Sequence, residues 1–392
     1  MASHHDPALS PVRRRRVVVL GSELTYLLRF RSHLLRAMVA AGHVVSIATP
    51  DVEPASSPLA DIGVAYHRVS MRPTGMDPRR DLTDLVAMVR WFRQLRPDVV
   101  FAYGAKPTTL GLAAAALTGV TRRYAMLPGL GYAFIDDGRR SFMRGVARVA
   151  QLAAYGLLLR GCERVIFHNE DDRDELVRRH VVGRDQAAVV AGSGVDLTQF
   201  EASPVPTSPV RFLFVGRLLR SKGVEELVQA ARALRSEVPT AEVHLVGSVD
   251  ANPDQIDQAL LDAARARGDV ICHGHVSDVR PHLRQCSAFV LPSYREGLPR
   301  SALEALATGR TTIVTDVPGC REVVRQGLHG TLVPVRDAHA LATALISYAR
   351  DPQRLIGEGQ AARRTAEDVF GVAAVTGAMM TLLGLRRDPE AS

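Results

Sequence analysis

Two positively charged side chains and a glycine lie between a short apolar run, residues 212–215, and a stretch with helical periodicity. They are Gly216, Arg217 and Lys222. The glycine lets a ligand approach the backbone, and cations near the amino end of a helix neutralise phosphate oxygens. The segment is not a P-loop, because Ser221 stands where the second glycine of the G-x-x-x-x-G-K motif belongs. These residues leave two interpretations open, a phosphate site and a solvated turn with two surface cations.

Two glutamates separated by seven residues form a second group. Glu296 follows the apolar run 288–291, and Glu304 falls on the second turn of a predicted helix that Pro299 is suited to begin. Free backbone N–H groups at a helix start attract an anion, and carboxylates accept hydrogen bonds from vicinal hydroxyls. The combination predicts a ligand with both phosphate and sugar. The alternative, that both glutamates only favour a helix start through the dipole, is plausible for Glu296 and weak for Glu304.

The elements that must position these residues follow a regular rhythm. Short apolar runs alternate with stretches of helical periodicity, which is typical of βαβ units and a parallel sheet. This alternation is interrupted once, by a segment rich in proline and serine, so the sequence predicts two α/β domains. The predicted organisation is a disordered leader at 1–15, an N-terminal domain at 16–200, a linker at 201–209, a C-terminal domain at 210–370 and a helix at 371–386 that crosses back to the N-terminal domain. Two such sheets facing each other place the loops at the carboxyl ends of their strands on one cleft, where we expect the chemistry.

The composition limits the class of protein. The chain has 392 residues, of which 49 are basic and 41 acidic, and its formal net charge of +8 favours anionic partners. Aromatic residues make up only 5%, which argues against a protein that stacks single-stranded nucleic acid on exposed rings. The sequence shows neither an apolar run long enough to span a membrane nor the apolar core of a signal peptide. We therefore expect a cytoplasmic protein.

No metal site is predicted. The four cysteines are scattered, and the two histidines His273 and His275 lack a third ligand nearby. Residues 172–174 formally spell D-x-D, but we interpret them as part of an acid-rich helix start with Asn169 as its cap. The glycines near 129 and 192 fail the G-x-G-x-x-G test, which argues against a dinucleotide-dependent oxidoreductase.

Taken together, the two groups resemble the donor-binding half of a family 4 retaining glycosyltransferase with the GT-B fold. The N-terminal half is similar to one branch of that family, which adds sugars to undecaprenyl-diphosphate-linked saccharides of bacterial glycans, capsules and O-antigens. The segments that carry this second resemblance are 30–44, 97–107, 128–132 and 165–172. The resemblance covers roughly residues 15–385. It implies an α/β protein of the GT-B class, with two Rossmann-like parallel-sheet domains facing each other across a cleft.

For the donor side, the resemblance implies a role for each residue of the two groups. Arg217 and Lys222 bind the donor diphosphate, Glu304 holds the ribose hydroxyls, and the segment 273–276 meets the edge of the nucleobase. Glu296 addresses the transferred sugar, together with the backbone N–H groups of the two residues that follow it. The implied donor-binding set is Gly216, Arg217, Lys222, His275, Val276, Glu296, Gly297, Leu298 and Glu304. Catalysis is expected to depend on Glu296, Lys222 and Arg217, with no metal and no cofactor.

For the acceptor side, the resemblance implies residues of the N-terminal half. They are Lys106, Gly129, Gly131, Tyr132, Arg140 and Arg144. The two arginines lie on one face of a predicted cationic amphipathic helix, which either rests on an anionic membrane or packs its apolar face into the core. We favour the membrane interpretation, because the implied acceptor is a membrane lipid. The chain departs from its relatives at Pro128, where they tend to have threonine, and at His168, where they tend to have glutamine.

The implied enzyme moves a hexose or N-acetylhexosamine from a UDP-sugar to a polyprenyl-diphosphate-linked saccharide. It is retaining and metal-independent, lies peripherally on the inner face of the plasma membrane and has no nucleic-acid partner. In the front-face scheme of this family the departing diphosphate takes the acceptor proton, so that no enzyme nucleophile is required. Two alternatives stay open. One is a soluble-acceptor transferase or UDP-sugar epimerase on the same fold, and the other is a non-catalytic, basic protein that binds a membrane or nucleic acid.

Overall fold

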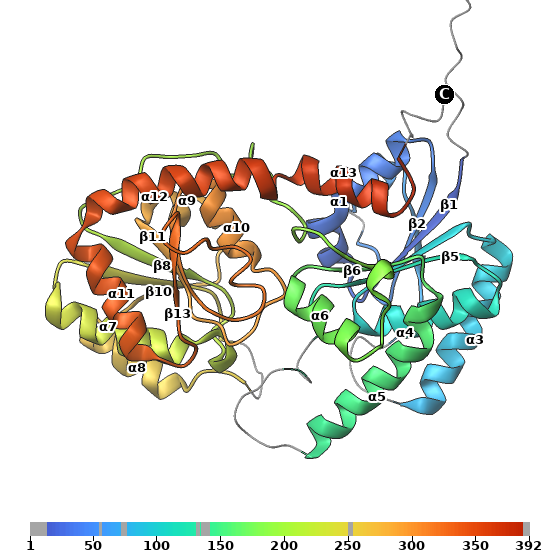
Figure 1. Cartoon of the computed structure of the whole chain (residues 1–392), viewed down its shortest axis with the longest axis horizontal. Coiled ribbons are helices and arrows are strands. Elements are labelled where there is room, and N and C mark those ends of the chain that lie inside the picture. The colour runs from blue at the N-terminus through green and yellow to red at the C-terminus, as the bar shows by residue number, and fades with distance from the viewer. Residues whose placement is uncertain are drawn as a thin grey trace, which may run out of the picture.

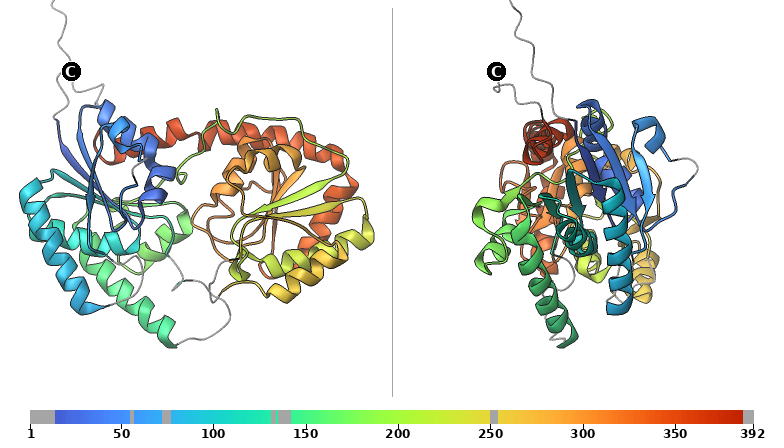
Figure 2. Two further views of the ribbon diagram at one scale, coloured as in Figure 1. Left: turned by 180° about the vertical axis from the view of Figure 1, so that it is seen from behind. Right: turned by 90° about the vertical axis from the view of Figure 1, so that its right-hand side faces the viewer.

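The chain forms two α/β domains that lie side by side (Figure 1). The computed structural model describes residues 14–54, 57–71, 77–130, 134, 142–249 and 254–386. Each domain is built on one parallel sheet with helices packed around it, as the views from behind and from the side also show (Figure 2). The predicted fold class, two Rossmann-like parallel-sheet domains, is confirmed.

The N-terminal domain has a seven-stranded sheet in the order β3-β2-β1-β4-β5-β6-β7. Its strands are β1 (Arg16–Leu20), β2 (Val44–Thr49), β3 (Ala65–Arg68), β4 (Val99–Tyr103), β5 (Arg122–Leu127), β6 (Arg164–Phe167) and β7 (Ala187–Val189). Its helices are α1 (Leu24–Ala40), α2 (Leu59–Ile62), α3 (Pro78–Leu95), α4 (Ala105–Leu117), α5 (Phe142–Leu158) and α6 (Glu170–Arg178). Every residue of β4 is buried, because a central parallel strand is covered on both faces.

The C-terminal domain has a six-stranded sheet in the order β10-β9-β8-β11-β12-β13. Its strands are β8 (Arg211–Val215), β9 (Glu242–Val246), β10 (Ile271–Gly274), β11 (Ala288–Leu291), β12 (Thr311–Thr315) and β13 (Gly330–Val333). Its helices are α7 (Val224–Glu237), α8 (Gln258–Arg267), α9 (Arg280–Gln285), α10 (Arg300–Ala307) and α11 (Ala338–Arg350). The strand order reverses between β8 and β11, and open parallel sheets bind ligands at such a point. Gly216 follows β8 and Glu296 lies in the loop after β11, so the sheet brings both predicted groups there.

Two segments connect the domains. One, residues 190–209, has no helix or strand. The other consists of α12 (Pro352–Thr365), a π-helical turn (Ala366–Phe370) and α13 (Val372–Leu382), which run along the top of both domains in Figure 1. The segments are bonded where they cross, since the Val195 N–H donates to the Phe370 oxygen at 2.7 Å and the Val372 N–H donates to the Val195 oxygen at 3.0 Å. Beyond this crossing, α13 packs on α1.

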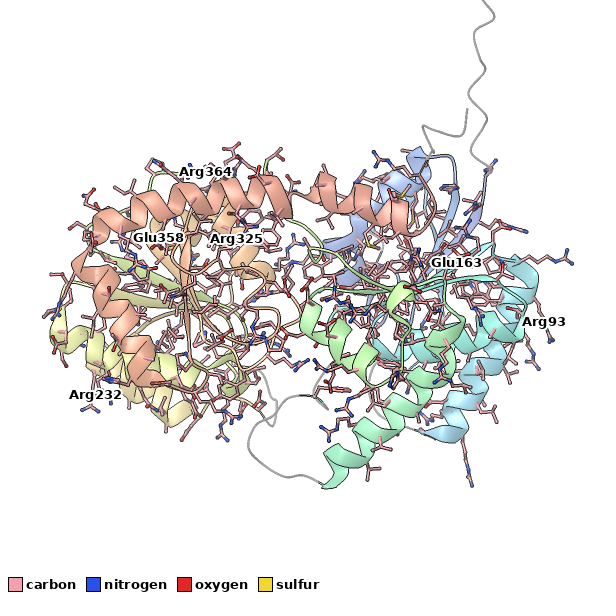
Figure 3. All side chains as sticks on the ribbon, in the orientation of Figure 1. Arg93, Glu163, Arg232, Arg325, Glu358 and Arg364 are labelled. Carbon is pink, nitrogen blue, oxygen red and sulfur yellow. The ribbon has the colours of Figure 1, made fainter. Side chains whose placement is uncertain are left out.

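Each domain has its own apolar core. Phe212 and Phe289 are fully buried in the C-terminal core, and Phe101 is fully buried in the N-terminal core. Charged side chains such as Arg93 and Arg232 point outward from the helices that cover the sheets (Figure 3). The cores therefore hold each sheet rigid and leave the loops between the domains to carry the site.

Candidate functional site

The loops at the reversal point pack closely because two positions are glycine. Gly223 has φ +69°, and a Cβ atom there would lie 2.0 Å from the oxygen of Pro292. Gly247 has φ +150°, and its Cβ atom would lie 1.8 Å from the oxygen of Gly216. Only glycine fits both places. Lys222, directly before Gly223, consequently reaches across to the loop after β11.

The carboxylate of Glu296 is held on one side. Its Oε1 atom accepts hydrogen bonds from Lys222 Nζ at 2.5 Å and from Ser293 Oγ at 2.7 Å. The side chain is 12% exposed, and its Oε2 atom has no protein partner among the described residues. One oxygen of Glu296 is thus fixed by the protein, and the other is available to a ligand.

Glu304 lies on α10 and is buried. Its partner is Arg300, one turn earlier, whose Nε donates to Oε1 at 2.8 Å. Burial raises the pKa of Glu304, while the charges of Arg300 and Arg29 oppose that shift. Arg300 also reaches the other domain, where its guanidinium lies 4.8 Å from the ring centre of Phe30 on α1. Arg29 and Arg300 are not among the site residues predicted from the sequence. The one available signal is the spacing of Arg300 and Glu304, which is that of a helical ion pair.

A cavity of about 360 Å³ lies between the domains, and we call it the main cavity. The C-terminal domain contributes the predicted Gly216, Arg217, Lys222, His275, Val276, Glu296 and Glu304, and the N-terminal domain contributes Arg29 and Phe30. Arg217 is exposed and has no ion-pair partner among the described residues, so its charge is available to an anion. Residues predicted from separate motifs therefore meet around one space, whose size suits a small-molecule ligand.

A smaller cavity of about 210 Å³, the inner cavity, adjoins the main cavity. The two share Phe30, Glu296, Pro299 and Arg300. The inner cavity is also lined by the predicted Gly297 and Leu298 and, from the N-terminal domain, by Tyr26, Pro128 and His168. Glu296 is therefore common to both spaces.

The predicted acceptor-side residues do not gather in the same way. Lys106, at the start of α4, pairs with Asp81 at 2.8 Å and lines neither cavity. Gly129 does lie at the domain boundary, since a Cβ atom on it would be 3.6 Å from the Cα atom of Gly297. Arg144 belongs to α5, whereas Gly131, Tyr132 and Arg140 lie outside the described residues.

The acid-rich segment is the first turn of α6, a helix start as expected. The Asn169 side chain caps α6 by accepting a hydrogen bond from the Asp172 N–H at 2.7 Å. Asp172 is completely buried and forms an ion pair with Arg295 of the C-terminal domain. Burial raises the pKa of Asp172, and Arg295 opposes the shift. The residue of the formal D-x-D motif is thus engaged in a contact between the domains.

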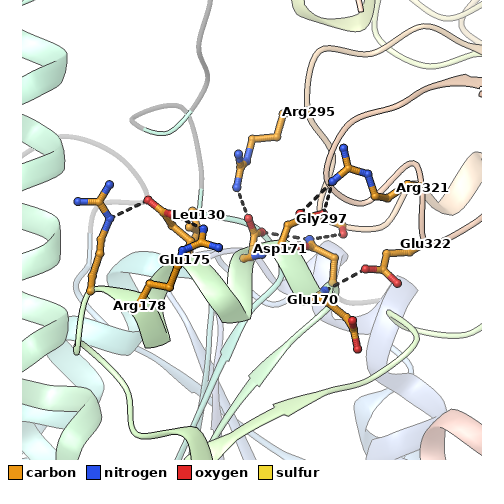
Figure 4. Close-up of polar contacts among 12 residues, drawn as sticks. Leu130, Glu170, Asp171, Glu175, Arg178, Arg295, Gly297, Arg321 and Glu322 are labelled. Carbon is orange, nitrogen blue, oxygen red and sulfur yellow. Dashed lines mark hydrogen bonds and ion pairs between the residues drawn. The ribbon is translucent and has the colours of Figure 1, made fainter. Parts of the chain in front are cut away.

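Further polar contacts join the start of α6 to loops of the C-terminal domain (Figure 4). The whole set, which we call the α6 clamp, consists of Asp172 with Arg295, Asp171 with Arg321 at 2.9 Å, the Asn169 amide with the Gly297 oxygen at 2.7 Å and the Glu170 N–H with Glu322 at 3.0 Å. Arg295 and Gly297 flank Glu296. The clamp therefore anchors the segment that carries Glu296 to the N-terminal domain.

The described part of the chain contains no group of three histidine, cysteine, aspartate or glutamate side chains placed to hold a metal ion. Among its helices, none is both long and apolar enough to cross a membrane.

Family models match both halves of the chain. The model described as glycosyl transferase 4-like domain matches residues 28–193, and the model described as glycosyl transferases group 1 matches residues 209–351. The chain carries the paired domains of a GT-B glycosyltransferase. The prediction of a glycosyltransferase is thereby confirmed.

Curated relatives of this glycosyltransferase act on different acceptors. The N,N'-diacetylbacillosaminyl-diphospho-undecaprenol alpha-1,3-N-acetylgalactosaminyltransferase of Campylobacter jejuni is 27% identical over 326 residues, 80% of this chain and 84% of the relative. A D-inositol 3-phosphate glycosyltransferase of an Arthrobacter species is 29% identical over 365 residues, 85% and 84% of the two chains.

Solved structures share the fold of this glycosyltransferase over nearly its full length. The sucrose-phosphate synthase of Thermosynechococcus elongatus has a TM-score of 0.76 at 21% identity, covering 94% of this chain and 98% of its own. The Anabaena protein Alr3699/HepE, solved in complex with UDP-glucose, has a TM-score of 0.74 at 17% identity, covering 95% and 100%. At these identities the likeness establishes the fold alone.

Proposed function

We propose that this glycosyltransferase moves a hexose or N-acetylhexosamine from a UDP-sugar to a polyprenyl-diphosphate-linked saccharide, with retention and without a metal ion. The observation that carries the proposal is the meeting of Arg217, Lys222, Glu296 and Glu304 around the main cavity. The donor class is supported by the Anabaena structure with UDP-glucose, and the acceptor class by the Campylobacter relative.

The main cavity suits a nucleoside diphosphate by charge. Arg217 and Lys222 neutralise the diphosphate oxygens, and the Glu296 ion pair holds Lys222 in place before the ligand arrives. Cations that are already oriented stabilise the charge that develops on a leaving diphosphate at no cost of reorganisation. The proposal that no metal ion takes part in the reaction therefore depends on these two side chains.

The nucleoside end of the donor is recognised by Glu304 and the neighbouring loop. Arg300 keeps the Glu304 carboxylate oriented, so that it accepts hydrogen bonds from the ribose hydroxyls. Residues His275 and Val276, which follow β10, line the same cavity and face the base. Phe30 and Arg29 close the cavity from the N-terminal domain.

The transferred sugar lies beside Glu296, whose free Oε2 atom accepts from its hydroxyls. The bond between the anomeric carbon and the diphosphate oxygen breaks, and the acceptor oxygen bonds to the same face of that carbon. The departing phosphate takes the acceptor's proton, so no side chain needs to act as nucleophile or base. The protein contributes orientation and electrostatic stabilisation.

Helix α5 supports a membrane-linked acceptor. Val146, Val149 and Leu157 lie along one side of it and are 45%, 67% and 80% exposed, whereas Tyr155 packs into the core. The interpretation that the whole apolar face of this helix is core is wrong for these residues. The helix extends from the lower edge of the N-terminal domain (Figure 1). Arg148 on the same helix is also exposed. A helix that exposes both an apolar stripe and a cation suits the surface of an anionic bilayer.

The test combines a panel of UDP-sugars with a detergent-solubilised polyprenyl-diphosphate-linked saccharide. We expect transfer with retention at the anomeric carbon, and a loss of at least about tenfold in turnover for Lys222→Ala and for Glu296→Ala with folding intact. Arg232→Ala, on the outer face of α7, is the matched control and should keep wild-type turnover. Inversion at the anomeric carbon, or full activity in either site variant, would contradict the proposal.

A soluble acceptor is the second candidate, favoured by the D-inositol 3-phosphate glycosyltransferase relative. In that case the wild-type enzyme should transfer the sugar at its full rate to a soluble acceptor in the absence of lipid. An epimerase on the same fold would instead convert the UDP-sugar when incubated alone, which nuclear magnetic resonance of the donor detects.

A further inference from the structure

His168 stands directly after β6 and lines the inner cavity, which it shares with Glu296. The residue is 6% exposed. Its Nε2 atom lies 3.0 Å from Nη2 of Arg31, a buried arginine of α1. Arg31 is itself anchored, because its Nη1 donates to the Gly192 oxygen at 3.3 Å and its guanidinium lies 4.9 Å from the ring centre of Tyr103. The imidazole therefore has a fixed neighbour on its Nε2 side.

This contact determines where the imidazole carries its proton. A guanidinium has donors and no acceptor, so Nε2 of His168 must accept. A neutral imidazole that accepts at Nε2 carries its hydrogen on Nδ1. A second proton would point at Arg31, and burial together with the Arg31 charge lowers the pKa of His168 well below its ordinary value. The ring is thus held as the neutral Nδ1–H tautomer.

The Nδ1 atom is available to a ligand. It has no hydrogen-bond partner among the described residues. It is also not one of the described polar atoms that are both buried from solvent and without a partner. The Oε2 atom of Glu296 is in the same situation. The inner cavity consequently presents an oriented donor from the N-terminal domain and an oriented acceptor from the C-terminal domain.

We propose that His168 is a specificity-determining residue whose Nδ1–H donates to one oxygen of the sugar that Glu296 binds. The proposal rests on the proposed function and extends it to the N-terminal wall of the site. At about 210 Å³ the inner cavity is smaller than a typical pocket for a whole ligand and suits a single sugar ring. Because its Nε2 lone pair accepts a hydrogen bond from Arg31, His168 recognises the position of one sugar oxygen and does not act as a base.

The test compares affinities for UDP and for a UDP-sugar, measured by calorimetry without acceptor. His168→Leu should leave the affinity for UDP within about twofold and weaken the UDP-sugar by about tenfold, because a site built to hydrogen-bond one group loses that contact alone. His168→Asn, whose amide N–H falls near the Nδ1 position, should recover part of the loss. The control is His43→Leu, a histidine of the same domain that is 5% exposed and bonds the Leu385 oxygen at 3.1 Å. It should change neither affinity.

Each other outcome overturns the proposal. An equal loss of affinity for UDP and for the UDP-sugar in His168→Leu, or no loss of either, would show that His168 makes no selective contact with the sugar. An unchanged donor affinity with a raised KM for the acceptor would assign the Nδ1–H to the acceptor saccharide instead. If the wild-type chain binds UDP but no UDP-sugar, or binds neither, the proposed function fails before any variant is compared.

A second measurement reports on the wild-type chain and needs a variant only to assign the signal. Nuclear magnetic resonance of the 15N-labelled histidine side chains, assigned with His168→Asn, reports the tautomer directly. A neutral Nδ1–H ring is expected at neutral pH, both free and with the donor bound. A charged ring or the Nε2–H tautomer would overturn the proposal.

Discussion

In the proposed donor site, we expect the Arg300–Glu304 pair to make nucleotide binding depend on pH. Burial raises the pKa of Glu304, so in the window above its ordinary value the folded protein holds this proton more tightly than the unfolded chain does. The contribution of Glu304 to stability therefore decreases as the pH rises through that window. Binding has the opposite sign, because the ionised carboxylate is the better acceptor for ribose hydroxyls.

We predict that Arg300→Gln weakens UDP binding and moves its pH dependence. Without the Arg300 charge, desolvation of Glu304 is opposed only by Arg29, so the pKa of Glu304 rises further. Affinity for UDP should fall as the pH falls, and the fall should begin at a higher pH in the variant. Calorimetry with UDP between about pH 5 and pH 8 measures this. Identical pH profiles for variant and wild type would show that Glu304 does not bind the ribose.

Gly297 contacts the N-terminal domain so closely that the addition of one carbon atom tests how well the domains fit together. A Cβ atom there would lie 1.6 Å from the Pro128 oxygen, although the backbone at Gly297 is not in the left-handed region. We expect Gly297→Ala to push the domains apart and to lower turnover by roughly a hundredfold, as small misplacements of reacting groups do. Gly357→Ala, on α12 with open space around it, is the control and should have no effect. An active Gly297→Ala variant would mean that this contact is not needed for transfer.

The α6 clamp contains two ion pairs that differ in burial. Asp172 is completely buried opposite Arg295, whereas Asp171 and Arg321 are 32% and 40% exposed. Removing one partner of a buried pair costs about 3–5 kcal/mol, and an exposed pair contributes about 0–1 kcal/mol. We predict a clear fall in Tm for Asp172→Asn and a small one for Asp171→Asn, by calorimetric unfolding. Equal effects would show that burial does not set the strength of the clamp.

Helix α5 gives a prediction about membrane contact. Val149→Asp combined with Leu157→Asp should lower binding to anionic vesicles by roughly tenfold or more, because two apolar contacts are lost and two negative charges are added. Both positions are largely exposed, so the fold should be unaffected. Ile356→Asp, on the exposed side of α12 in the other domain, is the control for sedimentation with vesicles. Unchanged sedimentation of the double variant would exclude α5 as the membrane contact.

The fold and the part of the main cavity formed by the C-terminal domain were predictable, because their signals are local. A strand such as β4 is apolar at every position, and that run is visible without any partner. Glu296 and Glu304 belong to one strand–loop–helix unit, so their spacing alone predicts that they meet. Lys222 joins them because β8 and β11 are neighbours at the reversal of the strand order.

The part of the main cavity formed by the N-terminal domain was not predictable, because it depends on how the two domains pack against each other. Arg29 and Phe30 reach Arg300 across 271 and 270 positions of sequence, and no spacing rule connects them. The contact of Asp172 with Arg295 likewise spans 123 positions. The sequence suggested only that His168 is unusual, and the position of Arg31 is what gives this residue a defined role.

The bonded crossing of the two connecting segments restricts how the molecule opens. Val195 is tied to Phe370 and Val372 on both sides, so the domains share one pivot and cannot slide past each other there. We expect any opening to be a swing about that pivot, in which displacement increases with distance from it. Spin labels placed near residues 195 and 371 should keep one separation with and without UDP, while labels at the far rims of the domains report the full angle of the swing.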